Sequence, residues 1–166
     1  MKKLLSFAIV FATLAFLATI PSYAINPSKT NETTIVISEN IETFEDGSQL
    51  ITVVYEDVSA ISTKATTFTK TGSKTASYKN SSGDVLFTLT TKGTFSVVSG
   101  TSSTCTSASY SHTSPGSGWS LKSGAASKSG NKAIGKGTFV KKTLGITVDT
   151  RDITCTLTCD VNGNLS

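Results

Sequence analysis

The stretch from Asp84 to Val98, DVLFTLTTKGTFSVV, constrains the fold more than any other part of the sequence. Side chains of a β-strand point alternately to the two faces of its sheet, so a strand with one buried face shows apolar residues at every second position. The stretch has this alternation throughout and predicts a long strand with one face in a core. We expect Gly93 to mark a bulge or a bend within it. The positions assigned to the buried face are Val85, Phe87, Leu89, Gly93, Phe95 and Val97.

Strand and turn signals recur along the rest of the chain. Thr33–Ser38 has strand character, and Ile41–Asp57 is typical of a hairpin that turns at Asp46-Gly47. Ser and Thr are abundant, Leu, Glu and Gln are sparse, and no segment shows a helical period. We therefore predict an all-β domain, either an antiparallel β-sandwich or a distorted barrel. Further strands are expected at Cys105–Thr113, Trp119–Ala126, Lys132–Lys142 and Thr147–Asp160, connected by SPGSG, SKSGN and TLGI.

The first 24 residues have the composition of a secretory signal peptide. Lys2 and Lys3 precede an uncharged apolar run, and small residues at Ser22 and Ala24 occupy the positions that a signal peptidase reads. We expect cleavage after Ala24. No later apolar stretch would hold the mature chain in a membrane, so we expect it to be secreted without a membrane span.

Charge divides the predicted mature chain into two parts. From Ile25 to Ala60 there are seven acids and a single lysine, whereas from Ile61 onward there are twelve bases and four acids. The segment Ser59–Thr71 shows no clear period, and we interpret it as a linker near Lys64. We therefore predict an acidic segment at 25–63 that contains the hairpin, and a basic β-sandwich domain at 64–166.

Several phrases resemble those of a family of small secreted β-rich proteins of Gram-positive bacteria whose activity is uncharacterised. They are FEDGS, TKTGSKTASYKNSSGDVLFTLTTKGTF, ASKSGNKAIGKGTF and LTCDVNGNLS, which together cover nearly all of the predicted mature chain. The resemblance implies export and a common β fold. It also implies one cysteine after the central hairpin and one in the terminal LTC phrase, which correspond to Cys105 and Cys159.

The three cysteines allow a metal site, a disulfide or a nucleophile. In an extended strand Cys155 and Cys159 are about 13 Å apart, which is too far for one zinc ion or for a bridge between them. Cys105 is then the partner of one of the two, and loop entropy does not distinguish them. Cys155 lies between Ile153 and Leu157 on an apolar face, and Cys159 ends the strand beside Asp160. With the resemblance, this favours a disulfide between Cys105 and Cys159 and no metal site.

Catalytic patterns are weak. His112 is the only histidine and lacks a neighbouring nucleophile motif, so we predict no catalytic residues and no cofactor. Trp119 opens a predicted strand and is assigned to the core.

The predicted function is that of a secreted, non-enzymatic β-domain that binds an unknown partner at a cell surface, an anionic wall polymer being one candidate. The lysines are spaced singly and are not interleaved with aromatic residues, which argues against nucleic acid as the partner. A bacteriocin-like effector acting on membranes is an alternative that the basic C-terminal part favours and the lack of an amphipathic helix disfavours. A secreted hydrolase is a further alternative.

Overall fold

The computed structural model describes residues 33–58 and 66–166, in which all regular secondary structure is β-strand. The strands form two antiparallel sheets, which confirms the all-β prediction and identifies a sandwich of two open sheets rather than a barrel. The predicted leader at 1–24 and the predicted linker around Lys64 lie outside the described residues. The strands are β1 (Thr33–Thr43), β2 (Gln49–Val58), β3 (Thr67–Lys79), β4 (Val85–Val98), β5 (Ser102–Thr113), β6 (Trp119–Ser129), β7 (Lys132–Thr143) and β8 (Ile146–Thr158).

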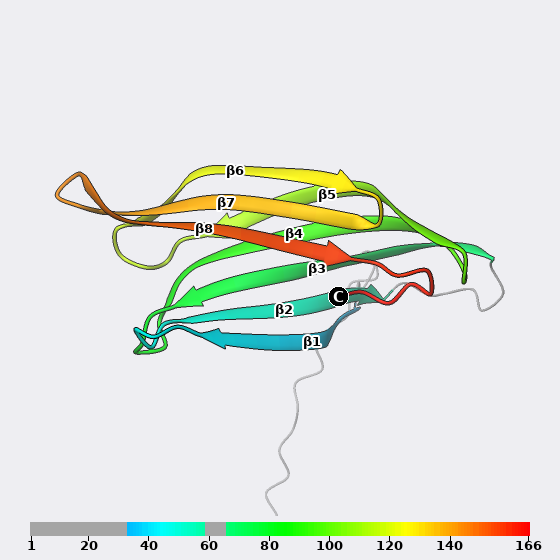
Figure 1. Ribbon diagram of the computed structural model, residues 1–166, viewed down its shortest axis with the longest axis horizontal. Coiled ribbons are helices and arrows are strands. Elements are labelled where there is room, and N and C mark those ends of the chain that lie inside the picture. The colour runs from blue at the N-terminus through cyan, green and yellow to red at the C-terminus, as the bar shows by residue number, and fades with distance from the viewer. Residues whose placement is uncertain (1–32, 59–65) are drawn as a thin grey trace, which may run out of the picture. The chain divides into compact units, whose positions relative to one another are not determined.

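Each sheet is a meander in which strands adjacent in sequence are hydrogen-bonded neighbours. The first sheet has the order β1-β2-β3-β4-β5, and the second has the order β6-β7-β8. The smaller sheet lies over β3, β4 and β5, because β6 contacts β5, β7 contacts β4 and β5, and β8 contacts β3 and β4 (Figure 1). The hairpin formed by β1 and β2 extends the larger sheet to one side of this double layer (Figure 1). The core therefore lies between β3–β5 and β6–β8.

The alternation from Asp84 to Val98 is confirmed in β4, where the predicted inward residues Phe87 and Phe95 are buried. The pairing of β4 with β5 shifts by one residue between Thr94 and Phe95, next to the glycine at which a bend was predicted. A Cβ atom on Gly93 would lie only 2.8 Å from the Cβ atom of Ala133 on the opposite sheet. A glycine is needed here because the two sheets approach each other too closely for a side chain.

Aromatic rings fill one half of the core. The ring of Phe87 stacks on that of Phe139 with 4.0 Å between centroids, and on that of Tyr78 with 5.1 Å. Trp119 packs against the same ring at 5.0 Å and is only 7% exposed, which confirms its assignment to the core. The other half of the core, called here the aliphatic half, is mostly aliphatic and contains a single fully buried aromatic ring, that of Phe95. Its residues are Val54, Phe95, Val97, Cys105, Ala133, Leu157, Cys159 and Leu165.

The interpretation of Ser59–Thr71 as a linker is wrong for its last residues, because Thr67–Thr71 belongs to β3. The inward positions at this end of β3 include Lys70, which is mostly buried and forms an ion pair with Glu56 of β2. An inward lysine interrupts the apolar alternation by which strands are recognised. The start of β3 is therefore not recognisable from the sequence, because the partner that allows Lys70 to face inward, Glu56, lies on another strand.

The acidic hairpin, defined here as β1 and β2, is hydrogen-bonded to the rest of the larger sheet. β2 pairs with β3 from Gln49 to Glu56, and Val54 on its inner side is 2% exposed within the aliphatic half of the core. Residues Asn31–Ser166 form one compact unit. A separable acidic segment with a boundary near Lys64 stays a prediction, with that boundary outside the described residues.

Candidate functional site

The structure brings together the two cysteines that were paired from the sequence. All three cysteines are free and buried, so a bridge between Cys105 and Cys159 is not formed in this structure. Cys105 and Cys159 share the aliphatic half of the core, whereas Cys155 belongs to the aromatic half. The β6–β7 turn joins their backbones, since Cys105 N donates to the carbonyl of Gly130 at 2.8 Å and Cys159 N to that of Asn131 at 3.0 Å.

Burial makes the three thiols poor nucleophiles and poor metal ligands. It raises the pKa of each of the three above the ordinary value for cysteine. All three also donate to main-chain carbonyls, Cys155 to Lys74 at 3.1 Å, Cys105 to Ser107 at 3.2 Å and Cys159 to Asp160 at 3.6 Å. Because the thiolate is both the nucleophile and the metal ligand, protonated thiols in a core suit neither role.

His112 lies on β5 and is exposed, and its ring contacts Phe139 edge-on with 6.3 Å between centroids. Within residues 33–58 and 66–166, no group of three or more His, Cys, Asp and Glu side chains lies close enough together to hold a metal ion. The three cysteines and His112 therefore do not form such a group there.

A small polar pocket of about 180 Å³ lies at the end of the sandwich where Trp119 lies. Two of its charged groups form an ion pair: Arg151 Nε donates to Asp149 Oδ2 at 3.3 Å, and the Arg151 guanidinium lies 5.4 Å from the ring centre of Tyr78. Asp46, at the turn between β1 and β2, accepts from the Ser48 hydroxyl and backbone N–H, which lowers the pKa of the Asp46 carboxyl. We interpret these contacts as holding the strand ends together.

Charge is segregated between the two sheets. The acidic hairpin, residues 33–58, carries six acids and no base. The basic sheet, defined here as β6, β7 and β8 (residues 119–158), carries seven bases and two acids. Its six lysines are all exposed. They are Lys122, Lys128, Lys132, Lys136, Lys141 and Lys142.

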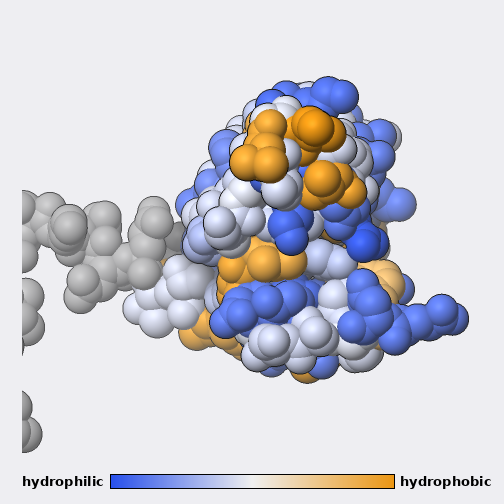
Figure 2. Space-filling model, turned by 90° about the vertical axis from the view of Figure 1, so that its left-hand side faces the viewer, coloured by the Kyte–Doolittle hydropathy of each residue, from blue (hydrophilic) through white to orange (hydrophobic). Residues whose placement is uncertain are grey.

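The hairpin between β7 and β8 carries apolar residues into solvent. We call Leu144, Ile146 and Val148 the apolar tip; they are 98%, 69% and 56% exposed. The hairpin projects at the left end of the sandwich in Figure 1. Figure 2 looks onto this end and shows hydrophobic side chains gathered near the top, with hydrophilic side chains around them. Exposed apolar residues rimmed by polar side chains make this end a candidate interaction surface.

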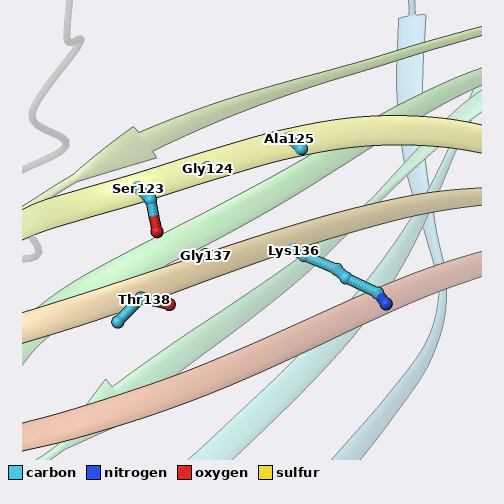
Figure 3. Close-up of a pocket in the computed structure, with 6 residues that line it drawn as sticks. All are labelled: Ser123, Gly124, Ala125, Lys136, Gly137 and Thr138. Carbon is cyan, nitrogen blue, oxygen red and sulfur yellow. The ribbon is translucent and has the colours of Figure 1, made fainter.

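The outer face of the basic sheet is hollowed where small residues face one another across β6 and β7 (Figure 3). The depression measures about 150 Å³ and is lined by Ser123, Gly124, Ala125, Lys136, Gly137 and Thr138. In Figure 3 the side chain of Lys136 extends from β7 towards β8. The hollow offers the Ser123 hydroxyl and the Lys136 ammonium group to a polar or anionic ligand, whereas the Thr138 hydroxyl donates to Asp152 Oδ1 at 2.6 Å. It lacks apolar walls deep enough to enclose a small molecule.

The sequence missed the apolar tip. The phrase TLGI was read only as a connection, which the structure confirms, since β7 ends at Thr143 and β8 begins at Ile146. The available signal was a leucine, rather than a polar residue, directly before the glycine of a two-residue turn.

Comparisons with protein families, with curated proteins and with solved structures found no match to this chain. No helix that could span a membrane is found among residues 33–58 and 66–166.

Proposed function

We propose that this chain is a secreted, non-enzymatic β-domain that binds at a cell surface through its basic sheet. One observation carries the proposal: the sheet has a net charge of +5, and its six lysines are all exposed, while the acids of the chain are concentrated in the acidic hairpin. Such a surface attracts polyanions over a distance set by the ionic strength. Anionic wall polymers and anionic lipids both present the required charge.

Export is part of the proposal. The leader-like stretch from Met1 to Ala24 and the resemblance to a family of secreted proteins of Gram-positive bacteria support it. A non-catalytic role is supported by the burial of the three thiols and by the surroundings of His112, whose ring contact is with Phe139.

A disulfide between Cys105 and Cys159 also belongs to the proposal. Both thiols lie in the same half of the core, and an exported protein meets oxidising conditions. Closing this loop would stabilise the fold by about 4 kcal/mol in the chain-entropy model. Non-reducing peptide mapping of the secreted protein should recover the linked pair together with an unmodified Cys155. Recovery of three free thiols would show that the bridge does not form.

The binding proposal is tested with a labelled chain that lacks the predicted leader, a change that leaves the compact unit Asn31–Ser166 whole. The chain should bind intact cells and cell envelopes of Gram-positive bacteria, and binding should fall steeply as salt is added. The double variant Lys132→Gln/Lys136→Gln removes two exposed lysines from the basic sheet and should weaken binding.

A matched control changes the net charge equally at another place. Ser109→Asp/Ser111→Asp alters exposed positions of β5, which lies at the edge of the other sheet. Binding of this control should stay close to that of the wild type. Equal losses in the two double variants would mean that net charge, rather than the basic sheet, governs attachment, and no binding at all would refute the proposal.

A further inference from the structure

The turn of the apolar tip has a backbone conformation that leucine disfavours. Leu144 and Gly145 form a two-residue turn with φ values of 51° and 82°, and positive φ at both positions is what a type I′ turn requires. Asn-Gly and Asp-Gly are the preferred pairs there, because a left-handed backbone is costly for other side chains. Leu144 is the one non-glycine residue with positive φ in residues 33–58 and 66–166.

Within residues 33–58 and 66–166, no packing of the Leu144 side chain offsets the cost of its left-handed backbone. Its side chain is almost fully exposed, so it gains no packing energy from the core. A strained and exposed apolar residue is a reason to look for a role outside the domain. Ile146 and Val148 follow in the same hairpin and are also exposed, so they enlarge the apolar surface near Leu144.

Lysines surround the base of this hairpin. Lys122 and Lys142 line one depression beside it, and Lys141 is the neighbouring exposed residue of β7. The nearest acid on β8, Asp149, forms an ion pair with Arg151. The projecting end therefore combines a protruding aliphatic surface with cationic side chains behind it.

We propose that the apolar tip inserts at the boundary between headgroups and acyl chains of an anionic lipid bilayer while the lysines at its base bind lipid phosphates. This inference rests on the proposed cell-surface binding and names its partner. An anionic wall polymer would attract the lysines equally well, but it has no hydrocarbon layer in which Leu144 could be buried. A bilayer supplies both the charge and the apolar layer.

The geometry limits the depth of insertion. The two residues of the turn lie beyond the last cross-strand pair, Thr143 with Ile146, and the polar groups of their peptide backbone need partners. These groups remain satisfied only where headgroups and water can reach them. The tip is thus an interfacial anchor, with lysines that extend their ammonium groups to the phosphate level.

The test is co-sedimentation of the chain, again without its predicted leader, with two kinds of vesicle: pure phosphatidylcholine, and phosphatidylcholine containing about a quarter phosphatidylglycerol. The wild type should bind the anionic vesicles and show little binding to the neutral ones. The decisive variant is Leu144→Asn, which removes the aliphatic side chain and provides a residue that the turn prefers. It should fold at least as well as the wild type and bind anionic vesicles about tenfold more weakly.

The matched control is Ile41→Ser in β1, which removes an aliphatic residue that is 53% exposed on the acidic hairpin. Its vesicle binding should equal that of the wild type. Unchanged binding of Leu144→Asn, equal losses in both variants, or equal binding to neutral and anionic vesicles would each overturn the inference.

The outcomes separate the inference from the proposal on which it rests. If the chain attaches to cells in a salt-dependent way but does not bind either vesicle, the proposed function stands and bilayer insertion is wrong. If Leu144→Asn loses attachment to cells but the wild type ignores vesicles, the tip recognises a protein or polymer, which also contradicts insertion. Failure to bind both cells and vesicles refutes the two together.

Discussion

The two outer hairpins expose similar apolar residues in opposite electrostatic settings. In the acidic hairpin, Val36 and Ile41 of β1 are 60% and 53% exposed, and six acids accompany them. In the β7–β8 hairpin, the apolar tip is at least as exposed and lysines accompany it. Apolar surface alone therefore does not distinguish the two hairpins as binding sites. The charge around it does, because acids repel an anionic surface and lysines attract it.

The turns of the two hairpins also differ, in how well their residues suit the backbone of the turn. The β1–β2 turn uses Asp46, which accepts hydrogen bonds from Ser48, and Gly47, which has a φ of 77°. These are residues that a turn prefers. The β7–β8 turn places Leu144 at a left-handed position that leucine disfavours. One turn suits the stability of the fold, whereas the other bears a conformational cost that binding would offset.

The largest expected effect comes from making the basic hairpin resemble the acidic one. Lys122→Glu/Lys142→Glu reverses two charges at the base of the tip. Because each lysine near an anionic membrane contributes about 1 kcal/mol, the double reversal should weaken binding to anionic vesicles by at least about a hundredfold. A vesicle titration measures this directly. Lys132→Glu/Lys136→Glu, placed elsewhere on β7, should have a clearly smaller effect, and an equal effect would mean that the tip has no special position.

A smaller effect separates the buried side of the acidic hairpin from the exposed tip. Val54→Ala removes methyl groups from the aliphatic half of the core and should destabilise the fold by about 2 kcal/mol. Val148→Ala makes the same chemical change at an exposed site and should leave the free energy of unfolding almost unchanged. Urea denaturation of both variants provides the comparison. An unchanged free energy of unfolding in Val54→Ala would show that the acidic hairpin contributes little to the core. That result is expected if the hairpin is a separable segment.

The strain at the tip predicts a stabilising substitution. Leu144→Asn should raise the free energy of unfolding by about 0.5 to 1 kcal/mol, because asparagine tolerates the left-handed backbone better. The corresponding change in the other hairpin, Asp46→Ala, should lower stability because it removes the acceptor for Ser48. Thermal unfolding of both variants tests the contrast. A destabilised Leu144→Asn protein would mean that the leucine serves the fold after all.

The smallest effect is a pH dependence at the turn of the acidic hairpin. Hydrogen bonds from Ser48 lower the pKa of Asp46 in the folded state, so their contribution to stability is present above the unfolded pKa of about 4 and is lost as the pH falls through the folded value. Asp46→Asn should therefore reduce stability at neutral pH and matter less in acid. Urea denaturation at neutral pH and at acidic pH tests this. The effect of Leu144→Asn should be the same at both.

Local patterns predicted much of the sandwich. The alternation in β4 identified inward residues such as Phe87 and Phe95, and Asp46-Gly47 and the TLGI phrase identified both outer turns. These features depend on residues close together in sequence. The start of β3 was missed because Lys70 faces inward, and its partner Glu56 lies on another strand. A buried ion pair of this kind has no local signature.

The candidate site was only partly accessible from the sequence. The opposite charges of the two parts could be counted, and the pairing of Cys105 with Cys159 remains a prediction that their shared place in the core supports. The exposure of the apolar tip could not be predicted from TLGI, because a leucine before the turn glycine indicates an unusual turn residue but not whether its side chain packs against the core. Only the three-dimensional arrangement shows that, in the part of the chain that the structure describes, Leu144 is 98% exposed and covered by no other strand.

Hydrogen–deuterium exchange of the same chain with and without anionic vesicles reports on both hairpins in one measurement. We expect slower exchange of backbone amides from Lys141 to Val148 when anionic vesicles are added, with no change in β1 and β2 and no change with neutral vesicles. Protection of β1, or protection of the whole outer face of the basic sheet with none at the tip, would contradict this expectation.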